Sequence, residues 1–259
     1  MSPPASPLPR LYGDLASLWP IMSPPRDYEP EAMMMRHAIE DHFPGLQPRV
    51  FELGSGGGHS IVHLKHWCRE VVGVDLSPAM IDLSRGLNPE CEHHVADMRT
   101  VRLGRMFDVV LIHDAIDYMT TPADVRSALE TAAAHLDAEG LLIVCPTYTA
   151  ETFTPGETAA DANGDEATEL HYVCRVDDPD PDDHVHHLDL LMLWRRAGRL
   201  HVARDRHTCG LFADREWQRM FTEAGFTCLR YDADDSPFGM YVGMRGEVWG
   251  NVCATAPRR

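Results

Sequence analysis

Residues 50–60, VFELGSGGGHS, constrain the fold of this chain more than any other stretch. A strand-like run, 50–53, is followed by five residues of which four are glycine, and then by a helix-like pattern. Glycine loses more conformational freedom on folding than any other residue, so such a cluster is costly unless something must approach the backbone closely. We therefore expect a ligand to lie against this loop, at the carboxyl end of a strand.

Strands and helices are predicted to alternate through residues 48–146. Strand-like runs occur at 49–53, 71–75, 91–97, 107–114 and 139–146, and helix-like runs at 59–69, 77–87 and 122–135. Ser77 is a predicted N-cap with Pro78 at the first helical position, and Thr121 opens a capping box with Asp124. This alternation is typical of a parallel sheet with helices on both faces.

The pattern changes on either side of this region. Residues 1–10 are proline-rich and predicted to be disordered, and 11–47 are predicted to form an N-terminal helical lid with helices at 11–19 and 29–45. After the fifth strand, 150–209 are predicted to form an antiparallel β insert with strands at 169–176, 183–196 and 199–210. A helix at 213–226 and two strands, 227–233 and 239–245, close a core made of 48–149 and 210–250.

Two carboxylates extend the ligand site. Asp75 ends the second predicted strand, about 20 residues beyond the glycine loop, where a carboxylate can accept hydrogen bonds from both ribose hydroxyls. Asp97 ends the third predicted strand and can accept a hydrogen bond from an exocyclic amine. The spacing indicates a nucleoside-type ligand, and it also suits a dinucleotide. The strict dinucleotide pattern G-x-G-x-x-G, however, requires glycine at position 59, where this chain has His59.

These motifs resemble those of the class I S-adenosylmethionine-dependent methyltransferases. Glu52–Gly58 resembles the E/D-x-G-x-G-x-G motif of that family, Asp75 its ribose-binding position, and Ala96-Asp97-Met98 its adenine-contacting segment. The resemblance implies an α/β, Rossmann-like sheet of seven mostly parallel strands with helices on both faces, and S-adenosyl-L-methionine as cofactor with S-adenosyl-L-homocysteine as product. The residues that it implies for the donor are Glu52, Gly54, Ser55, Gly56, Gly58, Asp75, Leu76, Met80, Ala96, Asp97, Met98, His113 and Tyr118, with Glu52 facing the donor's amino group.

The methyl acceptor is expected beyond the fourth strand, at residues 112–118. His113 is a candidate base or hydrogen-bond partner, and Asp114 could bind a cationic amine; one of them could instead cap the strand end. The D/N-P-P-Y/F/W motif of the DNA-adenine methyltransferases is absent from the sequence, which argues against a nucleobase acceptor.

The insert and the N-terminal segment resemble those of the small-molecule N-methyltransferases that dimethylate nucleotide-linked aminosugars. This resemblance implies an amine acceptor, a role in natural-product biosynthesis and a lid that folds over the donor. It also predicts a homodimer formed through the β insert. Candidate substrate-binding residues are Tyr12, Trp19, Arg26, Tyr28, Tyr148, Trp194 and His207.

Three other functions are compatible with the sequence. An O-methyltransferase would need a base such as His113, because a hydroxyl has a far higher pKa than an amine. A donor-binding protein without transfer activity would share the glycine loop and Asp75. A nicotinamide-dependent oxidoreductase would use the same loop for a dinucleotide.

Composition narrows the class of partner. The formal net charge of -17 disfavours nucleic-acid binding, because a protein binds nucleic acid through a basic face. No run of residues is apolar enough to span a membrane. The seven scattered cysteines and the lack of a signal peptide predict a cytoplasmic protein with reduced thiols. His184, His186 and His187 lack supporting ligands at metal spacing, so we expect no metal site and a solvent-facing strand there.

Overall fold

The computed structural model describes residues 8–231 and 239–245. Within these ranges, no helix is both long enough and apolar enough to cross a membrane. The expected disordered tail, 1–10, lies mostly outside the described residues, although Arg10 already begins a turn of 3₁₀ helix, η1 (Arg10–Tyr12). The last residues of the expected core, 246–250, also lie outside them.

A seven-stranded sheet forms the centre of the molecule, which confirms the predicted fold class. Its order is β10-β11-β5-β4-β1-β2-β3; β11 runs antiparallel to β5 and β10, and the other pairs are parallel. The strand bounds are β1 (Arg49–Leu53), β2 (Glu70–Asp75), β3 (Glu92–Val95), β4 (Phe107–His113), β5 (Leu136–Cys145), β10 (Thr227–Tyr231) and β11 (Met240–Met244). Since β1 lies between β2 and β4, strand order reverses there, and in open α/β sheets the ligand crevice lies at the carboxyl edge of this reversal.

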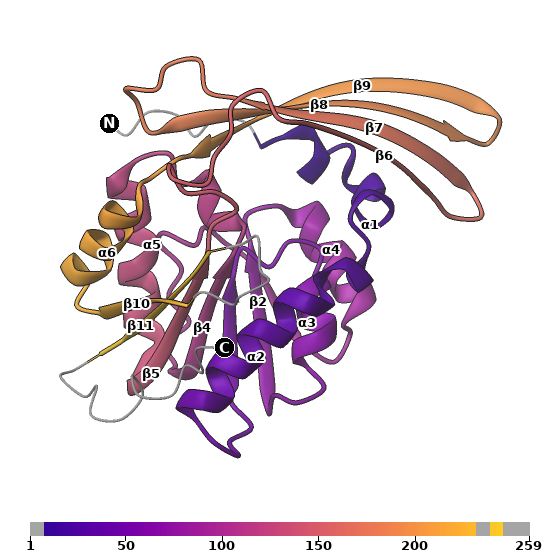
Figure 1. Ribbon diagram of the computed structural model, residues 1–259. Coiled ribbons are helices and arrows are strands. Elements are labelled where there is room, and N and C mark those ends of the chain that lie inside the picture. Colours follow the sequence, from indigo (N-terminus) through magenta and orange to yellow (C-terminus); the bar gives the residue numbers. More distant parts are fainter. Residues whose placement is uncertain (1–7, 232–238, 246–259) are drawn as a thin grey trace, which may run out of the picture.

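Helices cover both faces of this sheet (Figure 1). On one face, α5 (Pro122–His135) and α6 (Asp214–Glu223) pack on side chains such as Phe51 and Val110. On the other, α2 (Glu29–His42) and α3 (His59–Leu64) pack on Val50 and Leu111. The alternation of side chains along β1 therefore places Glu52 on the same face as Val50, toward α2 and α3.

Helix boundaries follow the capping signals. Ser77 accepts a hydrogen bond from the Met80 backbone N–H (3.1 Å) at the start of α4 (Pro78–Leu87), and Thr121 accepts one from Asp124 (3.1 Å) before α5. The helix expected at 59–69 is shorter, because backbone N–H groups of Trp67 and Cys68 both bond to Leu64 O (3.1 Å each) in a tight turn.

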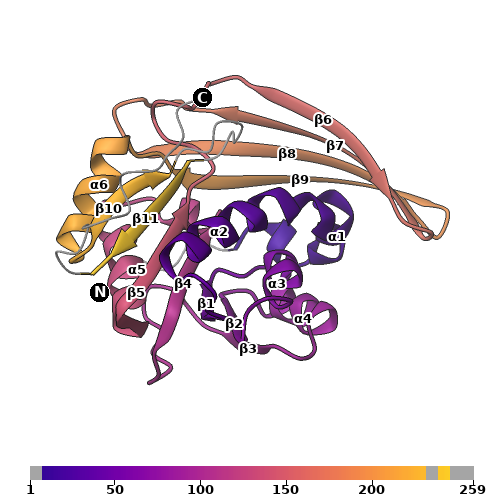
Figure 2. The same ribbon diagram turned by 60° about the horizontal axis from the view of Figure 1, so that its bottom comes forward.

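The insert is a second, four-stranded antiparallel sheet that extends over the core (Figures 1 and 2). Its strands, in spatial order, are β6 (Thr158–Gly164), β7 (Thr168–Asp177), β8 (Val185–Arg196) and β9 (Arg199–Gly210). We predicted three strands and missed β6. That strand is exposed on both sides, so it has no apolar alternation by which to recognise it.

The N-terminal segment lies between the two sheets (Figure 2). The helix predicted at 11–19 is instead a series of short turns, η1, η2 (Ala16–Leu18), α1 (Trp19–Met22) and η3 (Pro25–Tyr28). Gly13 and the prolines at 20, 24 and 25 interrupt longer helical hydrogen bonding. Leu11, Leu15 and Leu18 are buried in one cluster with Leu190 and Met192 of β8, so the segment is anchored on the insert.

Candidate functional site

The glycine loop joins β1 to α3 and takes conformations that favour glycine. Gly54, Gly56 and Gly58 have φ values of 79°, 52° and 78°. The Gly54 and Ser55 N–H groups bond to Val74 O (2.7 and 2.8 Å), which holds the loop on the end of β2. A Cβ on Gly54 would lie 2.8 Å from Met98 Cε and overlap the Ala115 side chain, so Gly54 allows close packing of three segments.

Asp75 braces this loop from the end of β2. Its Oδ2 accepts a hydrogen bond from Gly56 N–H (2.9 Å) and its Oδ1 from Ser77 N–H (2.8 Å). Burial nevertheless raises the pKa of this carboxyl. Each oxygen keeps a lone pair for a ribose hydroxyl. Of the neighbouring donor candidates, Met80 is buried and its Cε lies 3.5 Å from a Cβ built on Gly56, whereas Leu76 is 47% exposed.

Asp97 follows β3 and has a partner that the sequence did not indicate. The Arg99 guanidinium binds both oxygens of Asp97 (2.7 Å at the closest) and bridges to Asp124 at the start of α5 (2.7 Å). Burial alone would raise the pKa of Asp97, but the hydrogen bonds from Arg99 outweigh it and lower that pKa. Ala96 and Met98 pack against the main core on either side of this carboxylate.

Glu52 is a buried acid at the carboxyl end of β1. The residue is 2% exposed, and its Oε2 has no hydrogen-bond partner. Burial raises the pKa of Glu52 to about 7, against the opposing charge of His113. An unpartnered buried carboxylate oxygen is costly, so it marks a position where a polar ligand group fits. With the glycine cradle and Asp75, it suits the α-amino group of an amino-acid-containing nucleoside.

His113 ends β4 and is paired with Glu31 of α2. Its Nε2 lies 2.8 Å from Glu31 Oε2 and 3.5 Å from Asp114 Oδ1, and its Nδ1 lies 3.4 Å from Ser60 Oγ. Burial lowers the pKa of His113, but Asp114 and Glu31 outweigh burial and raise it to about 9. The imidazole is therefore a cation at neutral pH, which favours a binding or orienting role over that of a base.

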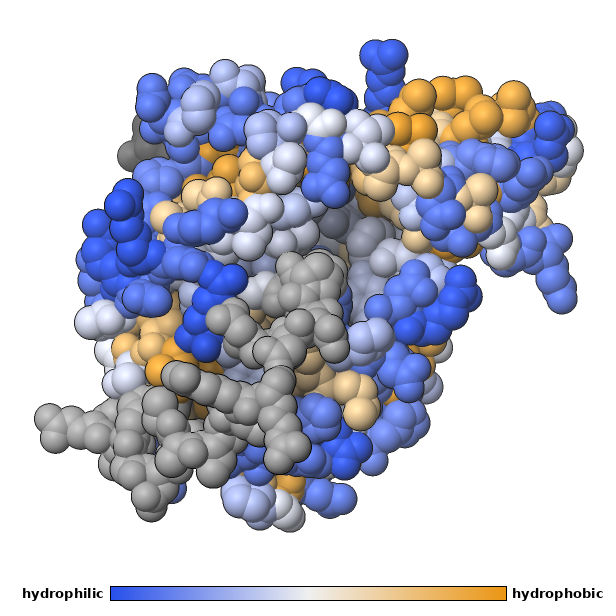
Figure 3. All heavy atoms as spheres, viewed as in Figure 1, coloured by the Kyte–Doolittle hydropathy of each residue, from blue (hydrophilic) through white to orange (hydrophobic). Residues whose placement is uncertain are grey.

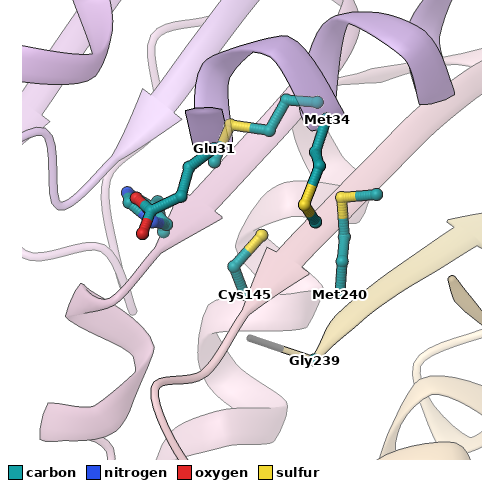
Figure 4. Close-up of a pocket in the computed structure, with 7 residues that line it drawn as sticks. Glu31, Met34, Cys145, Gly239 and Met240 are labelled. Atoms are coloured by element: carbon teal, nitrogen blue, oxygen red, sulfur yellow. The ribbon is translucent and has the colours of Figure 1, made fainter. Parts of the chain in front are cut away.

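Glu31 is a site residue that the sequence analysis missed. It lies in the first turn of α2, where an acid is expected for the helix dipole alone. Glu31 lines a small cavity of about 10 Å³ with His113, Cys145 and Met240. In Figure 4, Glu31 reaches down from its helix on one side, and the sulfur atoms of Met34, Cys145 and Met240 lie on the other.

Asp114 and Asp117 stand at the turn that follows β4. Asp114 has φ 44° and a side chain that is 48% exposed, so a sparsely populated backbone conformation places this carboxylate at the crevice. Asp117 is 8% exposed and accepts long hydrogen bonds from Thr147 N–H (3.2 and 3.3 Å). Burial raises the pKa of Asp117 to about 8, with a further contribution from Asp114.

Three of the predicted residues meet in one hydrogen-bond network. Tyr118 Oη lies 2.8 Å from Tyr12 Oη and 2.8 Å from His207 Nδ1, and His207 Nε2 lies 3.2 Å from Asp205 Oδ2. Asp205 also accepts a hydrogen bond from Leu11 N–H (2.7 Å). The network joins the N-terminal segment, the turn after β4 and β9, and so ties that segment to the insert.

Aromatic rings of the N-terminal segment cover the glycine loop. Trp19 stacks on His59 (centroids 6.1 Å apart), and Trp19 Cδ1 would lie 3.1 Å from a Cβ on Gly57. Tyr28 contacts both His59 and His113 edge to face (5.3 and 5.9 Å). In the sequence, His59 stands out only as a departure from the dinucleotide pattern, although a polar ring directly after the glycines is itself a signal for the site.

The other predicted residues lie farther out. Arg26 is exposed and pairs with Asp27 (3.6 Å), and Trp194 stacks on His201 (5.0 Å) on the second sheet. Among the described residues, neither contacts the side chains around the glycine loop. Tyr148 lies after β5 and contacts His186 edge to face (5.7 Å).

The histidines at 184–187 do not form a solvent-facing strand as we expected. Side chains along β8 point alternately to its two faces, and His186, which is 3% exposed, points inward. His184, just before β8, pairs with Glu216 (3.0 Å). Within residues 8–231 and 239–245, no three His, Cys, Asp or Glu side chains are grouped so that they could hold a metal ion.

Comparison with known families places a methyltransferase domain over residues 50–140, from β1 into β5. Two related sequences span nearly the whole chain. A dTDP-3-amino-3,6-dideoxy-α-D-glucopyranose N,N-dimethyltransferase from Streptomyces fradiae is 29% identical and covers 90% of this chain and 92% of its own. A dTDP-3-amino-3,4,6-trideoxy-α-D-glucopyranose N,N-dimethyltransferase from Streptomyces venezuelae is 28% identical over 85% and 92%.

Solved structures agree with the sequence relatives. A sugar N-methyltransferase from Streptoalloteichus superposes with a TM-score of 0.81 at 25% identity, covering 95% of this chain and 97% of its own. An amino pentose methyltransferase from Micromonospora echinaspora, solved with S-adenosylmethionine bound, gives 0.75 at 25% identity, over 85% and 92%. These likenesses include the second sheet as well as the glycine-loop core, since they extend over most of the chain.

Proposed function

We propose that this chain, a class I S-adenosylmethionine-dependent methyltransferase, transfers methyl groups to the amino group of a nucleotide-linked sugar. The observation that carries the proposal is the extent of the likeness to sugar N,N-dimethyltransferases, which continues through the insert and the N-terminal segment. Those parts lie over the crevice, where an acceptor has to bind.

The donor, in this proposal, lies along the glycine loop at the carboxyl edge of β1 and β2. Asp75 receives the ribose hydroxyls, Asp97 the adenine amine and Glu52 the donor's ammonium group. The donor supplies an electrophilic methyl group on a sulfonium sulfur. The protein excludes water from the site through Trp19 and Tyr28, and it holds the acceptor in line; such alignment contributes on the order of several kcal/mol.

His113 supports an amine acceptor better than a hydroxyl acceptor. A hydroxyl needs a strong base for transfer, but Glu31 and Asp114 hold His113 as a cation and leave it no capacity to take a proton near pH 7. An amine reaches its nucleophilic form far more readily, so orientation suffices. The natural-product role and the small-molecule acceptor follow from the same relatives.

The experiment that tests the function is a methyl-transfer assay with a dTDP-linked aminosugar. We expect mass spectrometry to show gains of one and then two methyl groups with S-adenosylmethionine. Asp75→Ala should abolish transfer and lower donor affinity by about 100-fold, since it removes a bidentate acceptor and the brace of the glycine loop. The control variant is Asp82→Ala, at an exposed position of α4, and it should behave as wild type. Transfer to the corresponding hydroxyl sugar instead would contradict the proposal.

We also propose a homodimer formed through the outward face of the second sheet. Apolar side chains stand exposed on neighbouring positions of β7, β8 and β9, and Figure 3 shows hydrophobic atoms gathered at the projecting end of this sheet. They are Val173, Leu191, Leu193, Leu200 and Val202, exposed by 37% to 64%. A contiguous patch of this kind is rare on a monomer and favours burial against a second copy.

Charge on that patch should separate the copies. We expect light scattering to give twice the chain mass for the wild type and the single-chain mass for the double variant Leu193→Asp/Val202→Asp. Leu229→Asp on β10, a similarly exposed leucine elsewhere, is the control and should leave the mass unchanged. A wild type that is monomeric at micromolar concentration would rule the dimer out.

A further inference from the structure

The pair between Glu31 and His113 joins two separate elements at the site. Glu31 joins the site from α2, whereas His113 ends β4, and within residues 8–231 and 239–245 this contact is the one hydrogen bond or ion pair of the Glu31 side chain. His113 also lies near Asp114 Oδ1 (3.5 Å), Ser60 Oγ (3.4 Å) and the ring of Tyr28, and the buried carboxylate of Glu52 interacts with its charge. His113 therefore has a second anion nearby if Glu31 turns to another cation.

Glu31 is also placed where that other cation can reach it. Its side chain is 18% exposed while that of His113 is 5% exposed, so the carboxylate is the more accessible member of the pair. The adjoining cavity, bounded by Met34, Cys145 and Met240, has room for little more than a water molecule. Apolar walls beside one carboxylate suit a small, partly apolar cation such as a methylated amine.

We propose that Glu31 binds the acceptor's amino group, exchanging its His113 partner for that group when substrate enters. This inference rests on the proposed function and names the residue that selects an amine over a hydroxyl. A carboxylate accepts hydrogen bonds from an ammonium and from a neutral amine alike, so the contact forms with either protonation state of the acceptor. A hydroxyl keeps one such bond but brings no positive charge, and it cannot replace the imidazolium.

The test measures binding of two ligands that differ at one atom. The ligands are the dTDP-linked aminosugar and its hydroxyl counterpart, each titrated into protein saturated with S-adenosylhomocysteine. We expect wild type to prefer the amine by about 10- to 100-fold, as a charge-assisted hydrogen bond in a dry site provides. Glu31→Gln should reduce this ratio to near 1 with donor affinity unchanged. Glu29→Gln, an exposed acid in the same turn of α2, is the matched control and should keep the wild-type ratio.

The outcomes separate the two proposals. A wild type that methylates the aminosugar while Glu31→Gln keeps the full preference for the amine overturns the role of Glu31 and leaves the function standing. A wild type that binds the donor but not the aminosugar overturns both. If Glu31→Gln loses donor affinity through misfolding, Glu31→Asp replaces it in the test because it keeps the charge. Glu31→Asp should retain part of the preference for the amine. If it instead binds both ligands equally more weakly, Glu31 has only a structural role.

Discussion

The Gly58→Ala variant should unfold with a free energy lower than that of the wild type by about 3 kcal/mol. Gly58 has φ 78°, and an L-residue held there costs about 1 kcal/mol. Its Cβ would overlap Ser84 Oγ and lie 2.5 Å from Asn88 Nδ2, two groups of α4 and its C-cap that are fully buried. Moving them adds about 2 kcal/mol, as for other overpacked sites. Chemical denaturation monitored by circular dichroism measures the difference.

A second glycine isolates the backbone contribution. Gly45 has nearly the same φ, 75°, but a Cβ there would meet nothing within 4 Å. Gly45→Ala should therefore cost only about 1 kcal/mol. Equal losses for the two variants would mean that close packing of α4 against the loop is not what position 58 requires.

The parts of the fold that followed from the sequence are those with strong local signals. The glycine loop, the apolar strands and the Ser77 and Thr121 caps define their own structure, and they reappear with almost unchanged bounds. The segment at 11–28 and strand β6 lacked such signals. The first is held by tertiary packing on β8 rather than by helix propensity, and the second is exposed on both sides.

The candidate site divides in the same way. Glu52, Asp75 and the glycines are adjacent in motif and in space, so one pattern revealed them together. Glu31 comes from a helix that the chain forms before the core begins, and only folding brings it to 2.8 Å from His113. Likewise, Tyr12, Tyr118 and His207 were predicted one by one, but the bonds that join them link segments more than 85 positions apart in sequence. Long-range pairing of this kind has no local signature.

Donor binding should strengthen by about 10-fold as pH rises from 6 to 8, and Glu52→Gln should remove this dependence. Burial raises the pKa of Glu52 to about 7, so this carboxyl is mostly protonated at pH 6 and mostly ionised at pH 8. Only the ionised form attracts the donor's ammonium group. His113 stays cationic over this range because its pKa is raised to about 9, so it does not account for the change.

Calorimetric titration of S-adenosylhomocysteine at both pH values distinguishes the two proteins. We expect Glu52→Gln to bind weakly at both pH values, with an affinity near that of the wild type at pH 6 and about 10-fold below it at pH 8, because a neutral amide loses a charge-assisted hydrogen bond. Stability should change with the opposite sign. A pKa raised on folding stabilises the native state below the unfolded pKa, and this contribution is lost as pH rises through about 7. The free wild-type protein should thus lose stability over the pH range in which it gains donor affinity. Glu52→Gln should show neither change. A variant that keeps the wild-type pH dependence would assign the titration to another carboxyl, for which buried Asp117, with its pKa raised to about 8, is the next to test.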